Sequence, residues 1–127
     1  MGRWLSVLIS RAACGFARGA VDGSQLLICA NMQAGDCNSG QTRSKARPED
    51  LGARAFIRID VANKAIDGAK RTTPIVGMSS DVNEILLQGT ELGYAWSIAL
   101  SKGGGALADT LVDHDNVTVS FGACTPQ

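Results

Sequence analysis

Large and small side chains alternate along much of this chain, and the alternation limits the possible fold more than any other feature. In residues 94–100, large side chains at even positions alternate with alanine or serine at odd positions. A period of two is typical of a β-strand with one face buried. A period of two also occurs in residues 55–61 and 117–121, where apolar side chains alternate mostly with charged or hydroxyl ones. For the last of these strands it predicts an inward face of Val117, Val119 and Phe121.

Short strands separated by turn residues are predicted over most of the chain. Pro74 lacks a backbone donor, so its strand is expected at a sheet edge, or with the proline at the strand's start. Residues 34–47 are polar and rich in turn formers, which predicts a long loop. Pro48 and Gly52 suit the two ends of one short helical turn near 48–52. The strand candidates are residues 24–31, 55–61, 65–66, 72–78, 82–89, 94–100, 106–112 and 117–121.

These strands follow one another at near-regular spacing, with no amphipathic helix between them. This order favours an all-β, single-domain antiparallel meander that closes into a small barrel or sandwich, and a lipocalin-like barrel is one such form. A chain of 127 residues has room for one domain. The β domain is expected over residues 24–127.

Four cysteines, Cys14, Cys29, Cys37 and Cys124, allow three pairings. A closed meander brings the first strand beside the last, which places Cys29 near Cys124. A disulfide between them is predicted if their Cα atoms lie within about 7 Å. The alternative is reduced, buried cysteines that pack as small apolar side chains. The spacing of Cys29 and Cys37 does not match the C-x-x-C step of zinc or redox sites, and no metal or cofactor is expected.

Residues 1–22 resemble a degraded export leader. Arg3 precedes an apolar stretch at residues 4–9, and small residues follow, which is the layout of a secretory signal peptide. Arg11 interrupts that layout. The alternative is a disordered or short amphipathic extension of a cytosolic chain. A periplasmic or secreted protein is therefore expected, with the cytoplasm left open.

Charge is balanced, with 12 Lys and Arg against 12 Asp and Glu. A nucleic-acid partner normally requires a basic excess or a basic face, so none is expected. The cluster of Arg43, Lys45 and Arg47 is interpreted as a solvated loop. No apolar run approaches the ~20 residues that a membrane-spanning helix needs, so no integral membrane segment is expected.

Four segments form a set of motifs along the chain. They are Pro48-Glu49-Asp50-Leu51-Gly52, Phe56-Ile57-Arg58-Ile59-Asp60, Leu87-Gln88-Gly89-Thr90-Glu91-Leu92-Gly93-Tyr94-Ala95-Trp96-Ser97 and Phe121-Gly122-Ala123-Cys124-Thr125-Pro126. These segments are similar to a family of small, uncharacterised exported proteins of Gram-negative bacteria. The similarity runs from about Cys29 to residue 127, and it implies export and a compact β fold but no activity.

Three functions follow as hypotheses. The leading one is a non-enzymatic structural or interaction module, with its partner unknown. The second is a lipocalin-like carrier whose cavity holds a small apolar ligand. The third is a hydrolase that uses His114, the single histidine, which lies between Asp113 and Asp115. Adjacent side chains diverge and no G-x-S-x-G elbow is present, so the sequence favours an exposed turn there. The residues expected to line the carrier's cavity are Tyr94, Trp96, Ile98 and Phe121.

Overall fold

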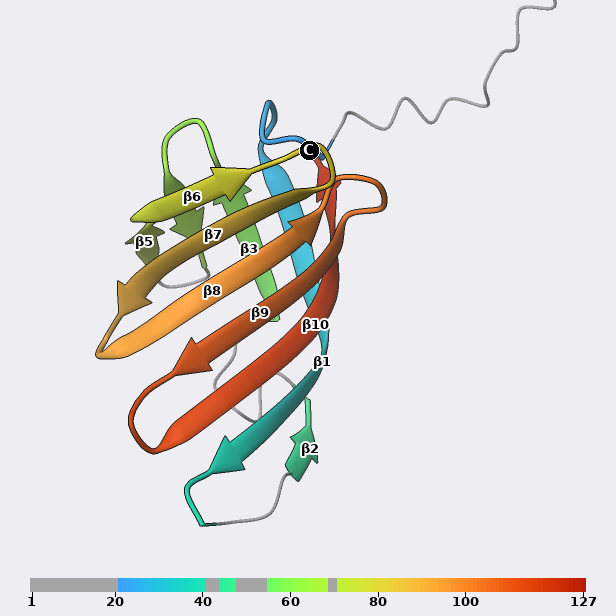
Figure 1. Ribbon diagram of the computed structural model, residues 1–127. Helices are drawn as coiled ribbons and strands as arrows, with labels where there is room; N and C mark the ends of the chain where they lie inside the picture. The colour runs from blue at the N-terminus through green and yellow to red at the C-terminus, as the bar shows by residue number, and fades with distance from the viewer. Residues whose placement is uncertain (1–20, 41–43, 48–54, 69–70) are drawn as a thin grey trace, which may run out of the picture.

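The computed structural model describes residues 21–40, 44–47, 55–68 and 71–127, and within them every regular element is a β-strand (Figure 1). This confirms the all-β prediction. The helical turn expected near 48–52 and residues 1–20 of the expected leader lie outside the described residues. The strands are β1 (Leu27–Asn38), β2 (Ser44–Ala46), β3 (Phe56–Asp60), β4 (Ala65–Asp67), β5 (Thr72–Pro74), β6 (Gly77–Ser80), β7 (Glu84–Glu91), β8 (Tyr94–Ser101), β9 (Ala106–Val112) and β10 (Asn116–Pro126).

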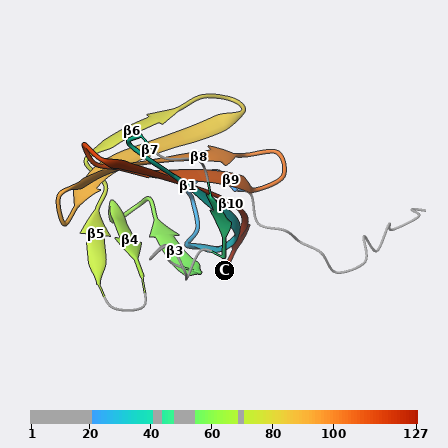
Figure 2. The same ribbon diagram turned by 90° about the horizontal axis from the view of Figure 1, so that it is seen from below.

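All of these strands join one antiparallel sheet in the order β5-β4-β3-β1-β10-β9-β8-β7-β6, with β2 paired to β1. The two edge strands, β5 and β6, are joined only by Ile75 and Val76. The three Cα–Cα steps from Pro74 to Gly77 span roughly 11 Å at most, so the sheet has to curl until these ends of its two edge strands lie close together. The Val76 amide donates a 2.9 Å hydrogen bond to the carbonyl oxygen of Gln88 in β7. Figure 2 shows the resulting half-barrel, with β3, β4 and β5 turned down from the layer of β6 to β9.

Two segments differ from their sequence predictions. Residues 72–78 form two strands at opposite edges of the sheet instead of one, although the edge placement expected from Pro74 is confirmed. The loop predicted for residues 34–47 is wrong in its first part, because β1 continues to Asn38, and again at Ser44–Ala46, which form β2. The polar residues of β1 from Gln33 onward pair with β10, and residues 34–36 also pair with β2. Pairing with the long strand β10 therefore keeps this segment extended, although its composition favours turns.

The core lies on the inner face of the curled sheet. Leu27 and Cys29 of β1 pair with Ile59 and Ile57 of β3, and all four side chains are buried. Directly across the other edge of β1, Cys29 faces Cys124, with 4.0 Å between their Cα atoms, and the two form a disulfide. The predicted pairing is therefore confirmed. The remaining core residues are Ile66, Ile75, Ile85, Leu87, Trp96, Ile98, Leu100 and Leu107.

The inward face predicted for β10 is wrong. Thr118, Ser120 and Cys124 are the buried side chains of this strand, whereas Phe121 is 52% exposed. The ladder of β10 with β9 runs without a bulge, so residues of even number share the side of Cys124. Apolar alternation alone therefore predicted the wrong buried face for β10. On β1 the register does shift, between Asn31 and Gln33, and burial moves from odd to even positions there.

Aspartates hold several of the turns. The Asp81 carboxylate accepts hydrogen bonds from the amides of Asn83 (2.7 Å) and Glu84 (2.8 Å) at the start of β7. These bonds stabilise the ionised form and lower the pKa of Asp81 below its usual value. The pKa of Asp60 is lowered for a similar reason, by the side chain and backbone of Asn63. Local sequence chemistry thus fixes the hairpins that the meander requires.

Candidate interaction surface

The residues expected to line a ligand cavity do not lie together. Tyr94, Trp96 and Ile98 share the inner face of β8, where Trp96 is 5% and Ile98 3% exposed. Phe121 projects from the outer face of β10. An added Cβ at Gly89, which pairs with Trp96, would lie 2.5 Å from Trp96 Cζ2. The glycine therefore leaves room for the indole over the backbone of β7, and Trp96 and Ile98 are part of a packed interior, whereas Tyr94 is only partly buried.

Polar side chains gather on the inner face beside that interior, which the sequence reasoning did not foresee. Thr118 and Ser120 of β10 and Asn31 of β1 are at most 7% exposed. Asp109 of β9 lies in register between Ile98 and Ser120. The position of Cys124 in the sequence could have revealed them, because Cys124, Ser120 and Thr118 all have even numbers. Once Cys124 points inward, Ser120 and Thr118 must do the same along an unbroken strand.

One buried donor stands out in this region. Within the part of the chain that the structure describes, the indole Nε1 of Trp96 is buried and has no hydrogen-bond partner. A buried donor in this state costs roughly 1–3 kcal/mol, so it calls for an acceptor. Within the expected cavity set, Trp96 therefore has a buried donor that no acceptor satisfies.

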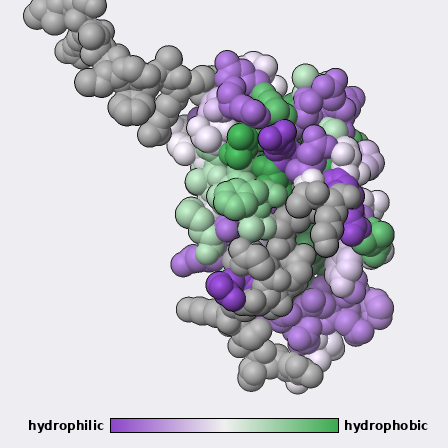
Figure 3. All heavy atoms as spheres, turned by 180° about the vertical axis from the view of Figure 1, so that it is seen from behind, coloured by the Kyte–Doolittle hydropathy of each residue, from purple (hydrophilic) through white to green (hydrophobic). Residues whose placement is uncertain are grey.

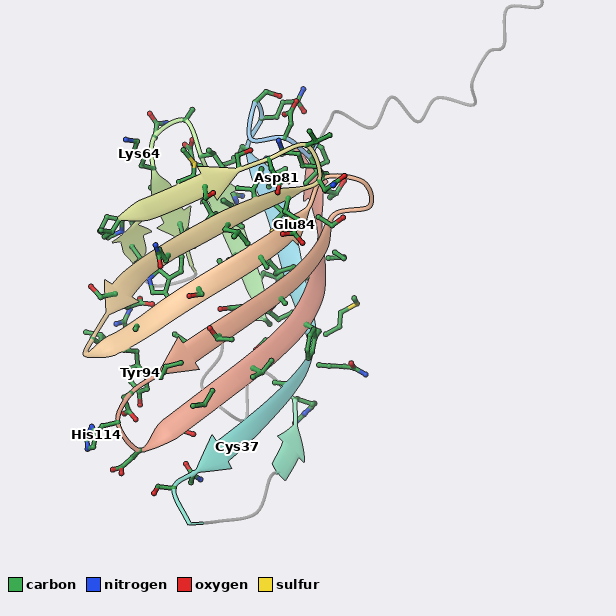
Figure 4. The ribbon with its side chains drawn as sticks, in the orientation of Figure 1. Cys37, Lys64, Asp81, Glu84, Tyr94 and His114 are labelled. Carbon is green, nitrogen blue, oxygen red and sulfur yellow. A yellow bond between two sulfur atoms is a disulfide. The ribbon has the colours of Figure 1, made fainter. Side chains whose placement is uncertain are left out.

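His114 lies in the turn between β9 and β10, and its side chain is 89% exposed. Its Nε2 is 3.4 Å from the Asp115 carboxylate. The Asp113 carboxylate instead accepts hydrogen bonds from the backbone amides of Asp115 and Asn116, which lower its pKa. Figure 4 shows His114 at this turn, at the end of the sheet away from Asp81 and Glu84. The arrangement is that of a capped turn, as the sequence favoured.

The outer face of five neighbouring strands carries no charged side chain over three rows of paired residues. We call these rows the uncharged face. It faces the viewer in Figure 1. Side chains of these five strands alternate between this face and the core, so the rows follow from the pairing registers. The rows are Leu86-Ala99-Ala108-Phe121-Gln33, Gln88-Ser97-Thr110-Val119-Gly35 and Thr90-Ala95-Val112-Val117-Cys37.

A shallow groove of about 340 Å³ lies over β6, β7, β8 and β9, at one side of this face. Small residues form its floor, among them Ala99 of β8 and Ala108 of β9, and Leu86 of β7 borders it. Phe121 stands next in the row beyond Ala108 and is half exposed. The face therefore has a hollow over β8 and β9 and a projecting aromatic side chain on β10.

The side of the molecule seen in Figure 3, opposite to the uncharged face, has a different surface composition. Hydrophobic residues reach the surface there among hydrophilic ones. The outward positions of β3 and β4 behind the uncharged face include Arg58, Asp60 and Asp67. A sheet that carries charges on one part of its outer surface and none in three rows across five strands of another part has a distinct patch, as interaction surfaces do.

Comparisons with known proteins give this chain no relative: no family model, no curated protein and no solved structure matches it. The described part of the chain holds no helix with the length and apolar character that crossing a membrane requires. The structure itself defines the class of protein: a disulfide-linked antiparallel β half-barrel with the uncharged face on its outside.

Proposed function

We propose that this protein is an exported, non-enzymatic module that works by protein–protein contact through its uncharged face. The observation that carries the proposal is the distribution of charge. The chain has 24 charged Asp, Glu, Lys and Arg residues, counted as 12 acidic and 12 basic, yet none falls in the three rows that span β7, β8, β9, β10 and β1. Depletion of charge around an exposed aromatic residue such as Phe121 is the compositional mark of interface cores.

Export is supported by the disulfide between Cys29 and Cys124. Disulfides persist in oxidising compartments and are rare in the bacterial cytosol. The leader-like layout of residues 1–22 agrees with a periplasmic or secreted location. The proposed site of action is therefore outside the cytoplasm.

Site-specific photocrosslinking in the source cells tests this function. A photoreactive amino acid replaces Ala108, in the middle of the uncharged face, or Asn83, in an exposed turn at the end of the sheet. Adducts with protein are expected at Ala108 and not at Asn83, because only the first position lies in the proposed contact. Equal yields at both positions would contradict the proposal.

A second candidate function is a carrier of a small, mainly apolar ligand at the inner face. It is favoured by the unpartnered Nε1 donor of Trp96, which an acceptor on the ligand would satisfy. Fatty acids, haem and similar molecules are titrated while tryptophan fluorescence is followed, with Trp96→Phe as the matched variant. A saturable change in the unchanged protein, together with weaker binding of the same ligand to Trp96→Phe in equilibrium dialysis, would support the carrier. A flat response of the unchanged protein across the panel would dismiss it.

A further inference from the structure

We propose that the uncharged face binds a second copy of this chain, with a two-fold axis that runs along β9. The inference rests on the proposed function and names its partner. Each copy would lay its sheet against the other, so that β9 faces β9 and β10 faces β8 of the partner copy.

Side-chain size along the rows supports this axis. A two-fold axis parallel to the strands exchanges β10 with β8 and keeps every residue at its own height. Phe121 would then face Ala99 of the other copy, and Val119 would face Ser97. In the third row Val117 would face Ala95. Each larger side chain of β10 thus meets a small one of β8, which is how facing layers interdigitate without voids or overlap.

The hollow and the projection on the face agree with the same exchange. The groove floor includes Ala99 and Ala108, and the half-exposed Phe121 lies one strand further along that row. One copy's Phe121 would fill the other copy's hollow, and the reverse contact would follow by symmetry. A face that carries both parts of a contact is self-complementary, as a two-fold interface requires.

Charge and shape favour a second copy over an oppositely charged partner. The rows offer no charge that could select a partner by electrostatic complementarity, so the matching surface should be uncharged too. A second copy supplies such a surface of the same extent. Figure 2 shows β7, β8 and β9 as a nearly flat layer, which allows contact over several strands.

The available area sets the expected strength. Five strands at ~4.8 Å spacing and three rows of residues cover roughly 500 Å² on each copy, or roughly 1,000 Å² in the pair. Specific interfaces begin at about this size, so a weak dimer with a dissociation constant on the order of micromolar is expected.

Sedimentation equilibrium of the oxidised chain at about 1–200 μM tests the dimer. Ala108 lies on the proposed axis, so Ala108→Lys would place two like charges against each other and raise the dissociation constant about 100-fold or more. The matched control is Val82→Lys. Val82 is 88% exposed in the turn before β7, so this change adds the same charge outside the face and should leave association unchanged. Circular dichroism establishes that both variants are folded.

A cross-linking measurement fixes the axis independently. Two proteins with one free thiol each are compared. The first carries Ala108→Cys together with Cys14→Ser and Cys37→Ser. The second carries only Cys14→Ser and keeps Cys37 as its free thiol. A thiol reagent of about 10 Å, the spacing of packed sheets, should join the thiols introduced by Ala108→Cys in two copies. It should not join the two Cys37 residues, which would lie four strand spacings, roughly 19 Å, apart across the face.

The outcomes separate this inference from the proposed function. An unchanged chain that is monomeric at every concentration, a dimer unaffected by Ala108→Lys, or equal cross-linking at Cys37 would overturn the two-fold dimer. If adducts at Ala108 then contain another protein, the proposed function still stands. If the Ala108 and Asn83 positions give equal adducts, both proposals fail.

Discussion

Reduction of the disulfide should remove a large part of the stability of this fold. Cys29 and Cys124 are separated by 95 residues in the sequence, and their bond joins the first and last long strands of the sheet. In the chain-entropy account, a cross-link of this separation restricts the unfolded ensemble by roughly 4–5 kcal/mol. Small domains are stable by about 5–15 kcal/mol, so the loss would be a third of that or more.

The measurement is urea unfolding followed by tryptophan fluorescence, with and without a thiol-free reductant. With a slope of about 2 kcal/mol per molar urea, the midpoint should fall by roughly 2–2.5 M on reduction. Reduction leaves both thiols in place, so core packing is preserved and the change reports mainly on the unfolded chain. Cys37→Ser is the control, because Cys37 is exposed and outside the disulfide. The Cys37→Ser variant should show the same fall of the urea midpoint on reduction.

A change in the free energy of unfolding below about 1 kcal/mol on reduction would refute this reasoning. It would mean that the reduced unfolded chain keeps β1 and β10 close, or that the bond is strained enough to cancel its gain. The double variant Cys29→Ala and Cys124→Ala should lose still more than reduction does, because Cys29 is fully buried and truncation leaves a cavity.

Two further changes test the packing and the turns. Gly89→Ala should destabilise the fold by about 1–3 kcal/mol, because its Cβ would lie 2.5 Å from the buried ring of Trp96. Gly104→Ala, whose Cβ would meet nothing within 4 Å, is its control, and equal midpoints in urea would contradict the assigned contact. The lowered pKa of Asp81 means that its contribution to stability is complete above its usual pKa and is lost as pH falls through the lowered value. Asp81→Asn should therefore flatten the decline of the urea midpoint below about pH 4, and an unchanged acid profile would count against the role of this carboxylate.

The fold class could be predicted from local signals, and the disulfide followed from the topology of that class. Alternation placed β8 and flanking turns placed β9 within a residue of their observed ends, and a closed meander brings its first and last strands together. The inner face of β10 failed because valine and phenylalanine alternate there on the outside. Only the pairing with Cys29 across β1 reveals which side is covered.

The candidate surface could not be predicted in the same way. Each strand contributes only a few of its residues, and the strands come from both ends of the sequence. In the sequence, nothing distinguishes Ala99 and Ala108 from other small residues. Only the pairing registers show that they lie in one row with Phe121. The depletion of charge is likewise invisible along the chain, because charged turns interrupt it at every hairpin. Topology had to be known before composition could be interpreted.

The position of β10 between β1 and β9 has a consequence for biogenesis. Until Pro126 leaves the synthesis machinery, β1 lacks one of its two neighbours, and the two halves of the sheet remain separate hairpins. Such long-range pairing is intrinsically slow to form. The complete sheet and its disulfide can therefore form only after β10 has been synthesised.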